Sequence, residues 1–113
     1  MAIIFNKISV IGLGLIGTSI LHSIKANEDK GVVTYAYDIN PDHRSIVTKL
    51  NIATFVFDNI EDNVKECELI ILAVPVGSMK SVASSITPYL KKNAIVTDTG
   101  STKRSVIKDV NPF

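Results

Sequence analysis

The sequence predicts an α/β domain built around one doubly wound parallel sheet. Short runs of apolar and β-branched residues alternate with longer amphipathic segments, a pattern typical of strands connected by helices that cross over a sheet. A glycine-rich turn at residues 12–17 separates the first apolar run from the first amphipathic segment. With 113 residues, of which 46% are hydrophobic, the chain can fill one packed core but not two ordinary domains.

The first strand is predicted at residues 7–11, and the glycine turn leads from it into a helix that ends at about residue 26. In this helix Ile16, Ile20 and Ile24 recur every four residues and therefore share one face. We expect that face to cover the sheet.

The second strand is predicted at residues 32–37. After it, Asn40 provides a side-chain acceptor for a helix N-cap, Pro41 suits the first helical position, and Asp42 places an acid in the first turn. These signals predict a helix that runs to about Leu50.

A short third strand is predicted at residues 54–57. Asp58 is followed three residues later by Glu61, a spacing that resembles a helix-capping arrangement. We therefore expect a brief helix to begin there.

The fourth strand is predicted at residues 69–74, where six consecutive apolar residues require cover on both faces and so a central place in the sheet. Beyond Pro75, residues 77–78 are expected to begin a helix that extends to about residue 86. Pro88 then ends or kinks it, because proline cannot continue the backbone hydrogen bonding.

A fifth strand is predicted at residues 94–97, followed by a turn at 98–101 and a last helix at about 102–109. The expected sheet is of Rossmann type, with about five strands in the order 3-2-1-4-5. We expect residues 1–113 to be a partial NAD(P)-binding domain that stops before a sixth strand.

Composition excludes several classes of function. A formal net charge of +1 argues against nucleic acid as a partner, and the longest apolar stretch, from Leu69 to Val76, is under half of the roughly 18 residues that suggest a membrane span. The single cysteine, Cys67, and the two histidines, His22 and His43, are too few for a disulfide or a thiolate metal site, so no metal is expected. We expect a cytoplasmic protein, with Cys67 in the core and both histidines facing solvent.

The glycine turn GLGLIG carries the strongest functional signal because a strand precedes it and a helix follows it. Gly12 permits a tight turn, Gly14 lets the backbone approach a pyrophosphate, and Gly17 lets helix and strand pack closely. The amides of the first helical turn, at Leu15 and Ile16, would then face the phosphates. The alternative is that the glycines serve only the turn.

Asp38 ends the second strand, 21 residues beyond Gly17. A carboxylate there can accept both hydroxyls of an adenosine ribose and repel a 2′-phosphate, which favours NAD over NADP. His43 and Arg44 are close enough in sequence to weaken this preference if they fold over the ribose.

Further candidates follow the fourth and fifth strands, because open parallel sheets bind ligands at the carboxyl ends of their strands. The alternatives are a simple strand exit and helix capping by Ser101 or Thr102. The cofactor-binding candidates at these two strand ends are Val74, Pro75, Val76, Thr99 and Gly100.

Four segments together resemble the prephenate and arogenate dehydrogenases of tyrosine biosynthesis. Residues 12–19 resemble that family's GLGLIGGS opening, with a departure at Thr18, and residues 37–40 resemble its YDIN segment. Residues 72–76 and 98–103 resemble its LAVPV and D-x-GS-x-K stretches. Related β-hydroxyacid dehydrogenases share the first and third segments, and another member of that group remains an alternative.

The resemblance implies NAD-dependent oxidative decarboxylation of prephenate to 4-hydroxyphenylpyruvate, with a hydride passed to the nicotinamide. It also implies a catalytic role for Ser101, which matches a family serine that helps to place the substrate hydroxyl and the catalytic histidine. Lys103 matches the family pattern without a role that the sequence explains.

One departure from the family concerns catalysis. The family's catalytic histidine lies in a G-H-P segment, followed by a helical domain for substrate binding and dimerisation, and neither occurs in these 113 residues. We therefore expect the chain alone to bind cofactor without turning over prephenate, and a homodimer only for a longer protein. A non-catalytic dinucleotide-binding module and an arogenate dehydrogenase are the alternatives.

Overall fold

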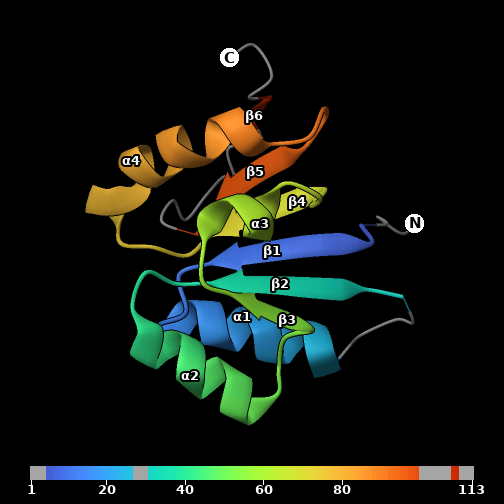
Figure 1. Cartoon of the computed structure of the whole chain (residues 1–113), viewed down its shortest axis with the longest axis vertical. Helices are drawn as coiled ribbons and strands as arrows, with labels where there is room; N and C mark the ends of the chain where they lie inside the picture. The colour runs from blue at the N-terminus through green and yellow to red at the C-terminus, as the bar shows by residue number, and fades with distance from the viewer. Residues whose placement is uncertain (1–4, 27–30, 100–107, 110–113) are drawn as a thin grey trace.

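The computed structural model describes residues 5–26 and 31–99, and the backbone of 108–109. Helices and strands alternate along the chain (Figure 1). The elements are β1 (Lys7–Ile11), α1 (Leu15–Ala26), β2 (Val33–Tyr37), α2 (Pro41–Leu50), β3 (Phe55–Phe57), α3 (Ile60–Val64), β4 (Leu69–Leu72), α4 (Val76–Ile86), the 3-10 turn η1 (Thr87–Tyr89), β5 (Ile95–Asp98) and β6 (Lys108–Asp109).

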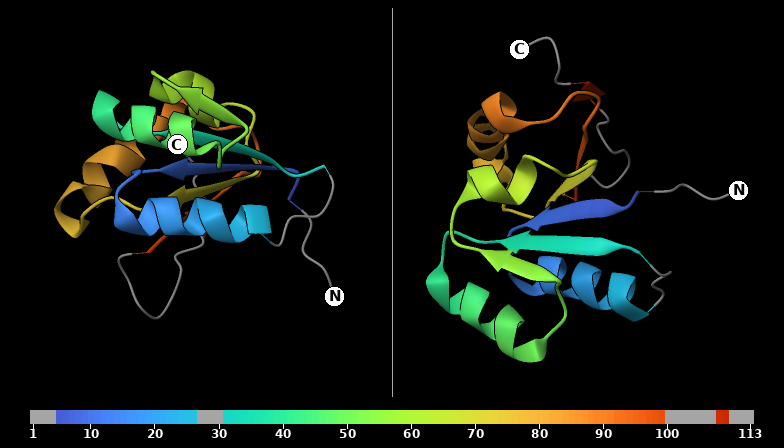
Figure 2. Two further views of the ribbon diagram at one scale, coloured as in Figure 1. Left: turned by 90° about the horizontal axis from the view of Figure 1, so that it is seen from below. Right: turned by 45° about the vertical axis from the view of Figure 1, so that its right-hand side comes forward.

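The strand order is β3-β2-β1-β4-β5-β6, which confirms the predicted order of the first five strands. Those five strands are parallel, and β1 lies at the centre with Ile11 in register with Tyr37 of β2 and Leu72 of β4. Helices cover both faces of this Rossmann-type sheet, and Figure 2 shows α1 lying along one side of it. The carboxyl ends of all five parallel strands therefore meet at one edge.

Each face of the sheet has its own apolar core, as a doubly wound fold requires. The central strand β4 contributes to both, because Ile70 and Leu72 face one core and Ile71 packs against the other. The core beneath α1 and α2 contains Val10, Leu13, Leu21, Ala36, Val47 and Ile52. The core beneath α3 and α4 contains Ile11, Tyr35, Val64, Cys67, Ile70, Leu72, Ile86, Ala94 and Val96.

The caps of α2 confirm the sequence signals at its start. Asn40 has extended backbone, and its side-chain oxygen accepts a hydrogen bond of 2.8 Å from the Asp42 N–H. At the other end Asn51 adopts a left-handed conformation, and its N–H donates to the carbonyls of the last turn. These caps fix the position of the first turn of α2, which lies next to the carboxyl end of β2.

Two local predictions were wrong by about one residue. The buried residues of α1 are Gly17 and Leu21. Of the predicted face, Ile20 packs against the core but Ile16 is exposed, so the buried face is rotated by about one residue from the predicted one. The cap of α3 is Asn59, whose side chain accepts from the Asp62 N–H, and not Asp58.

The carboxyl-terminal helix predicted at residues 102–109 is also wrong at its end. Lys108–Asp109 form strand β6, which pairs antiparallel with Ile95 and Val96 of β5. The remainder of that predicted helix lies outside the described residues.

Candidate functional site

The candidate site lies where the chain leaves β1, at the carboxyl edge of the sheet. Gly12 donates its N–H to the Tyr37 carbonyl at 2.8 Å, and its φ of 103° favours glycine. A β-carbon on Gly12 would lie 2.5 Å from the Ala73 carbonyl oxygen, and one on Gly17 would lie 1.7 Å from the Gly12 carbonyl oxygen. The three backbone segments thus pack so closely that neither position has room for a side chain.

Gly14 differs from these two glycines because a β-carbon built on it would meet no atom within 4 Å. The space in front of it is therefore open to a ligand. Gly14 precedes α1, whose first turn carries no acid, so no carboxylate from that turn accepts from the leading amides at Leu15 and Ile16. Open space next to the N–H groups at the start of a helix fits a pyrophosphate.

The Asp38 carboxylate lies beside this loop and is held from three directions. Its Oδ2 accepts from the Leu13 N–H at 2.6 Å and lies 3.0 Å from His43 Nδ1, and its Oδ1 accepts from the Asn40 N–H at 2.8 Å. Burial raises the pKa of Asp38, but the hydrogen bonds from Asn40, Leu13 and His43 outweigh it and hold the pKa below its usual value. The carboxylate is therefore ionised at neutral pH.

The sequence predicted that His43 faces solvent, but the structure places it only partly in solvent. Its side chain is 40% exposed, and its Nδ1 atom contacts Asp38. Because Asp38 is ionised, the proton of this hydrogen bond belongs to Nδ1. Arg44 also contacts Asp38, because its Nη1 donates to the Asp38 backbone carbonyl at 2.8 Å. His22, by contrast, is exposed on α1 as predicted.

The sequence analysis assigned no role to Leu13 or Thr18, which complete the loop. Leu13 is buried, its N–H donates to Asp38, and its carbonyl accepts from Thr18 Oγ1 at 3.1 Å. Thr18 stands where the family's glycine opening has another residue. That difference was the one sequence signal that could have pointed to its contact with Leu13. The backbone N–H and C=O of Leu13 are therefore both held by side chains.

The segment after β4 lies against the glycine turn at Gly12. The Ala73 N–H donates to the Ile11 carbonyl at 2.7 Å, which continues the β1–β4 ladder by one residue. Val74 is partly buried against the core, Pro75 is the N-cap residue of α4, and Val76 is exposed. Pro75 is exposed as well, so two of these three candidates, Pro75 and Val76, are open to a ligand.

The segment after β5 is only partly described. The N–H of Thr99 donates to the Leu72 carbonyl at 3.1 Å, and its hydroxyl donates to the same oxygen at 3.4 Å. These bonds tie Thr99 to β4. Gly100, Ser101 and Lys103 lie outside the described residues.

Cys67 is a buried core residue, as predicted. Its Sγ donates to the Asn63 carbonyl at 3.3 Å, and burial raises the pKa of the thiol to about 12. The thiolate, which is the nucleophilic form, is therefore not populated at neutral pH. Among the described residues, no group of three or more His, Cys, Asp or Glu side chains is arranged to hold a metal ion.

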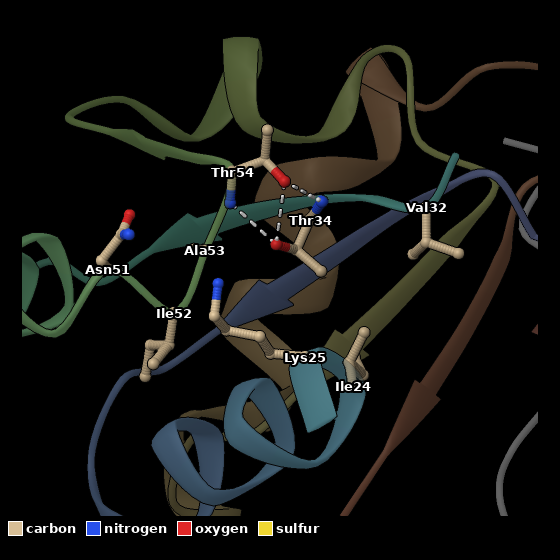
Figure 3. Close-up of a pocket in the computed structure, with 8 residues that line it drawn as sticks. All are labelled: Ile24, Lys25, Val32, Thr34, Asn51, Ile52, Ala53 and Thr54. Atoms are coloured by element: carbon tan, nitrogen blue, oxygen red, sulfur yellow. Dashed lines mark hydrogen bonds between the residues drawn. The ribbon is translucent and has the colours of Figure 1, made fainter. Parts of the chain in front are cut away.

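A hollow of about 270 Å³ lies at the opposite edge of the sheet, away from the glycine turn (Figure 3). Thr34 and Thr54 line it, and each backbone N–H donates to the other residue's hydroxyl. These reciprocal bonds tie the segment before β3 to β2. The hollow therefore lies at a strand connection, away from the candidate site.

Comparisons with known proteins show the family to which the chain belongs. A sequence model of the prephenate dehydrogenase nucleotide-binding domain matches residues 22–113. Cyclohexadienyl dehydrogenase from Zymomonas mobilis is 44% identical over 93% of this chain, and prephenate dehydrogenase from Lactococcus lactis is 33% identical over 94% of it. This chain spans only 36% and 29% of those two proteins.

The structural comparison gives the same result. The crystal structure of prephenate dehydrogenase from Aquifex aeolicus in complex with hydroxyphenyl propionate and NAD+ superposes with a TM-score of 0.80 at 27% identity. The superposition covers 99% of this chain and 39% of the chain in that crystal structure. In the described part of this chain, no helix has the length and apolar character needed to cross a membrane.

The geometry of the glycine turn predicts a large effect of alanine at one glycine and a small effect at another. Gly17→Ala should lower the free energy of unfolding by at least about 3 kcal/mol, because the new β-carbon would overlap the Gly12 carbonyl. Gly14→Ala should change it by less than about 1 kcal/mol, because its β-carbon meets open space. Urea unfolding of both variants measures the difference, and equal losses would contradict the packing described.

The lowered pKa of Asp38 predicts a pH-dependent contribution to stability. The ionised carboxylate stabilises the fold above the unfolded pKa of about 3.9, and this contribution is lost as pH falls through the lower folded value. Asp38→Asn should therefore cost about 1–2 kcal/mol at neutral pH and progressively less below about pH 4.

Urea unfolding across a pH series tests this expectation. Asp58→Asn is the matched control, because Asp58 is exposed and lies after the neighbouring strand β3. We expect Asp58→Asn to change stability by less than about 0.5 kcal/mol. A cost of Asp38→Asn that does not vary with pH would show that the carboxylate charge is not involved.

Proposed function

The chain belongs to the family of prephenate dehydrogenase nucleotide-binding domains, and from this membership we propose that it binds NAD at the carboxyl edge of its sheet. The protein would serve as the cofactor-binding part of a dehydrogenase of tyrosine biosynthesis. That enzyme would convert prephenate to 4-hydroxyphenylpyruvate by oxidative decarboxylation.

One arrangement carries the proposal. Gly14, which has open space at its β-carbon position, lies directly before α1 and directly after Leu13, whose N–H binds the ionised Asp38. The amides of Leu15 and Ile16 would hold the pyrophosphate, and Asp38 would accept the hydroxyls of the adenosine ribose. The exposed apolar side chain of Ile39, directly after Asp38, suits the face of a base. The solved relative that contains NAD+ supports the same class of cofactor.

Asp38 also supports NAD over NADP. A carboxylate accepts hydrogen bonds from ribose hydroxyls, whereas a 2′-phosphate would place a second negative charge against it. Because Asp38 is largely enclosed, solvent screens that repulsion less than it would at an exposed acid.

The reacting end of the site would be formed by the segments after β4 and β5. Val74, Pro75, Val76, Thr99 and Gly100 are proposed to line the nicotinamide end, with Ser101 placing the substrate hydroxyl. When bound, the nicotinamide supplies the hydride acceptor. The substrate class would be a cyclohexadienyl acid, either prephenate or arogenate, as the name of the Zymomonas mobilis relative suggests.

Catalysis would depend on residues that this chain lacks. His22 is exposed on α1, and His43 is engaged with Asp38 at the ribose end, so neither lies where hydride transfer would occur. The chain spans about a third of its curated relatives, and a homodimer in the cytoplasm is proposed only for a protein of their length.

Calorimetric titration with NAD and NADP tests the cofactor site. The wild-type chain should bind NAD about tenfold more tightly than NADP, and Asp38→Asn should weaken NAD binding at least about tenfold, because a charge-assisted hydrogen bond contributes about 1.5–3 kcal/mol. Asp58→Asn, which makes the same charge change at the neighbouring strand end, should leave NAD binding unchanged. A folded chain that binds neither cofactor would refute the site.

A second measurement addresses catalysis. The chain mixed with NAD and prephenate should give no steady formation of reduced nicotinamide, because no histidine reaches the nicotinamide end. Absorbance of the reduced cofactor follows the reaction, and a full-length relative provides the positive control. Steady turnover by this chain alone would contradict the expectation.

A further inference from the structure

The contact between His43 and Asp38 bears on how strongly the site distinguishes NAD from NADP, an inference that rests on the proposed NAD site. A carboxylate offers about four lone-pair directions to hydrogen-bond donors. In Asp38 three of them are directed at Leu13, Asn40 and His43. Two ribose hydroxyls therefore cannot both bind while all three donors stay in place.

His43 is the donor that can leave. The other two donors are backbone N–H groups, one in the glycine turn and one at the N-cap of α2, and neither can turn away without distorting an element. The His43 side chain is 40% exposed, whereas that of Asp38 is 11% exposed. Rotation of the His43 imidazole toward solvent would free a second lone-pair direction on the Asp38 carboxylate for a ribose hydroxyl.

Asp38 also lies between two basic side chains. Arg44 is fixed at the end of β2 by its bond to the Asp38 carbonyl, and His43 donates to the Asp38 carboxylate. A proton donor on the carboxylate draws off part of its negative charge, and the guanidinium places a positive charge nearby. Both effects reduce the repulsion that a 2′-phosphate would meet.

We propose that His43 sets the cofactor selectivity of this site. Its imidazole competes with the ribose hydroxyls for Asp38 and offsets the charge of that carboxylate, so the site favours NAD only modestly and admits NADP. His43 is thus a selectivity residue that acts through Asp38.

Calorimetric titration of the chain with NAD and NADP measures the effect of His43→Ala. We expect NAD binding to tighten about threefold and NADP binding to weaken about tenfold, a shift of about thirtyfold in their ratio, because one competing donor and one partial counter-charge are lost together. His22→Ala is the matched control, since His22 is exposed on α1, and it should leave both affinities unchanged. A thermal melt of each variant confirms that it is folded.

The Asp38→Asn background tests whether the effect is transmitted through the carboxylate. There, His43→Ala should change the NAD to NADP ratio by less than about twofold, as expected when two mutations remove the same interaction. An unchanged ratio in folded His43→Ala, or the same shift with Asp38 absent, would overturn the proposal. Failure of the wild-type chain to bind either cofactor would instead refute the NAD site itself.

Discussion

The rest of the structure depends on the close packing of three backbone segments at the end of β1. The chain turns at Gly12 against the Ala73 carbonyl, and α1 then returns so near that Gly17 touches the Gly12 carbonyl. This contact sets the rotation of α1 about its own axis. Gly17 and Leu21, one turn apart, must face the sheet, and Ile16, about 100° around the helix from Gly17, is turned outward. Gly14, with open space in front of it, lies directly before the first residue of the helix.

Asp38 extends this organisation from the glycine turn to α2. Its carboxylate joins the Leu13 peptide, the N-cap of α2 and His43, while Thr18 holds the Leu13 carbonyl from the other side. The turn proposed for the pyrophosphate is therefore connected through one peptide group to the acid proposed for the ribose. Donors already directed at the carboxylate keep it ionised despite its burial, so the negative charge is in place before any ligand arrives.

Features encoded by short stretches of sequence were predictable, and those set by the contact of distant segments were not. The apolar run at β4 and the Asn40-Pro41-Asp42 start of α2 depend on neighbouring residues, so both were predicted correctly. The face of α1 was predicted only in part, because a four-residue repeat places Ile20 against the core but does not give the rotation at Gly17 that leaves Ile16 exposed. The His43 contact depends on how the cap of α2 directs its first turn back toward β2, and no residue pattern records that direction.

At the carboxyl edge of the sheet, the residues that stabilise the fold are mostly different from those proposed to bind the ligand. Gly12, Gly17 and Leu21 are buried and serve packing, whereas Gly14 and Leu15 are exposed and contribute little to the core. Ligand-facing positions can therefore vary without loss of the fold, as expected for a nucleotide site carried on a common scaffold. Asp38 is the exception, because the hydrogen bonds that hold the turn to α2 end on the same oxygens that would accept the ribose. We thus expect cofactor preference to change more readily by substitution of His43 than of Asp38. His43 is proposed to alter the charge and the free hydrogen-bonding positions of Asp38, and it is not needed to hold the turn.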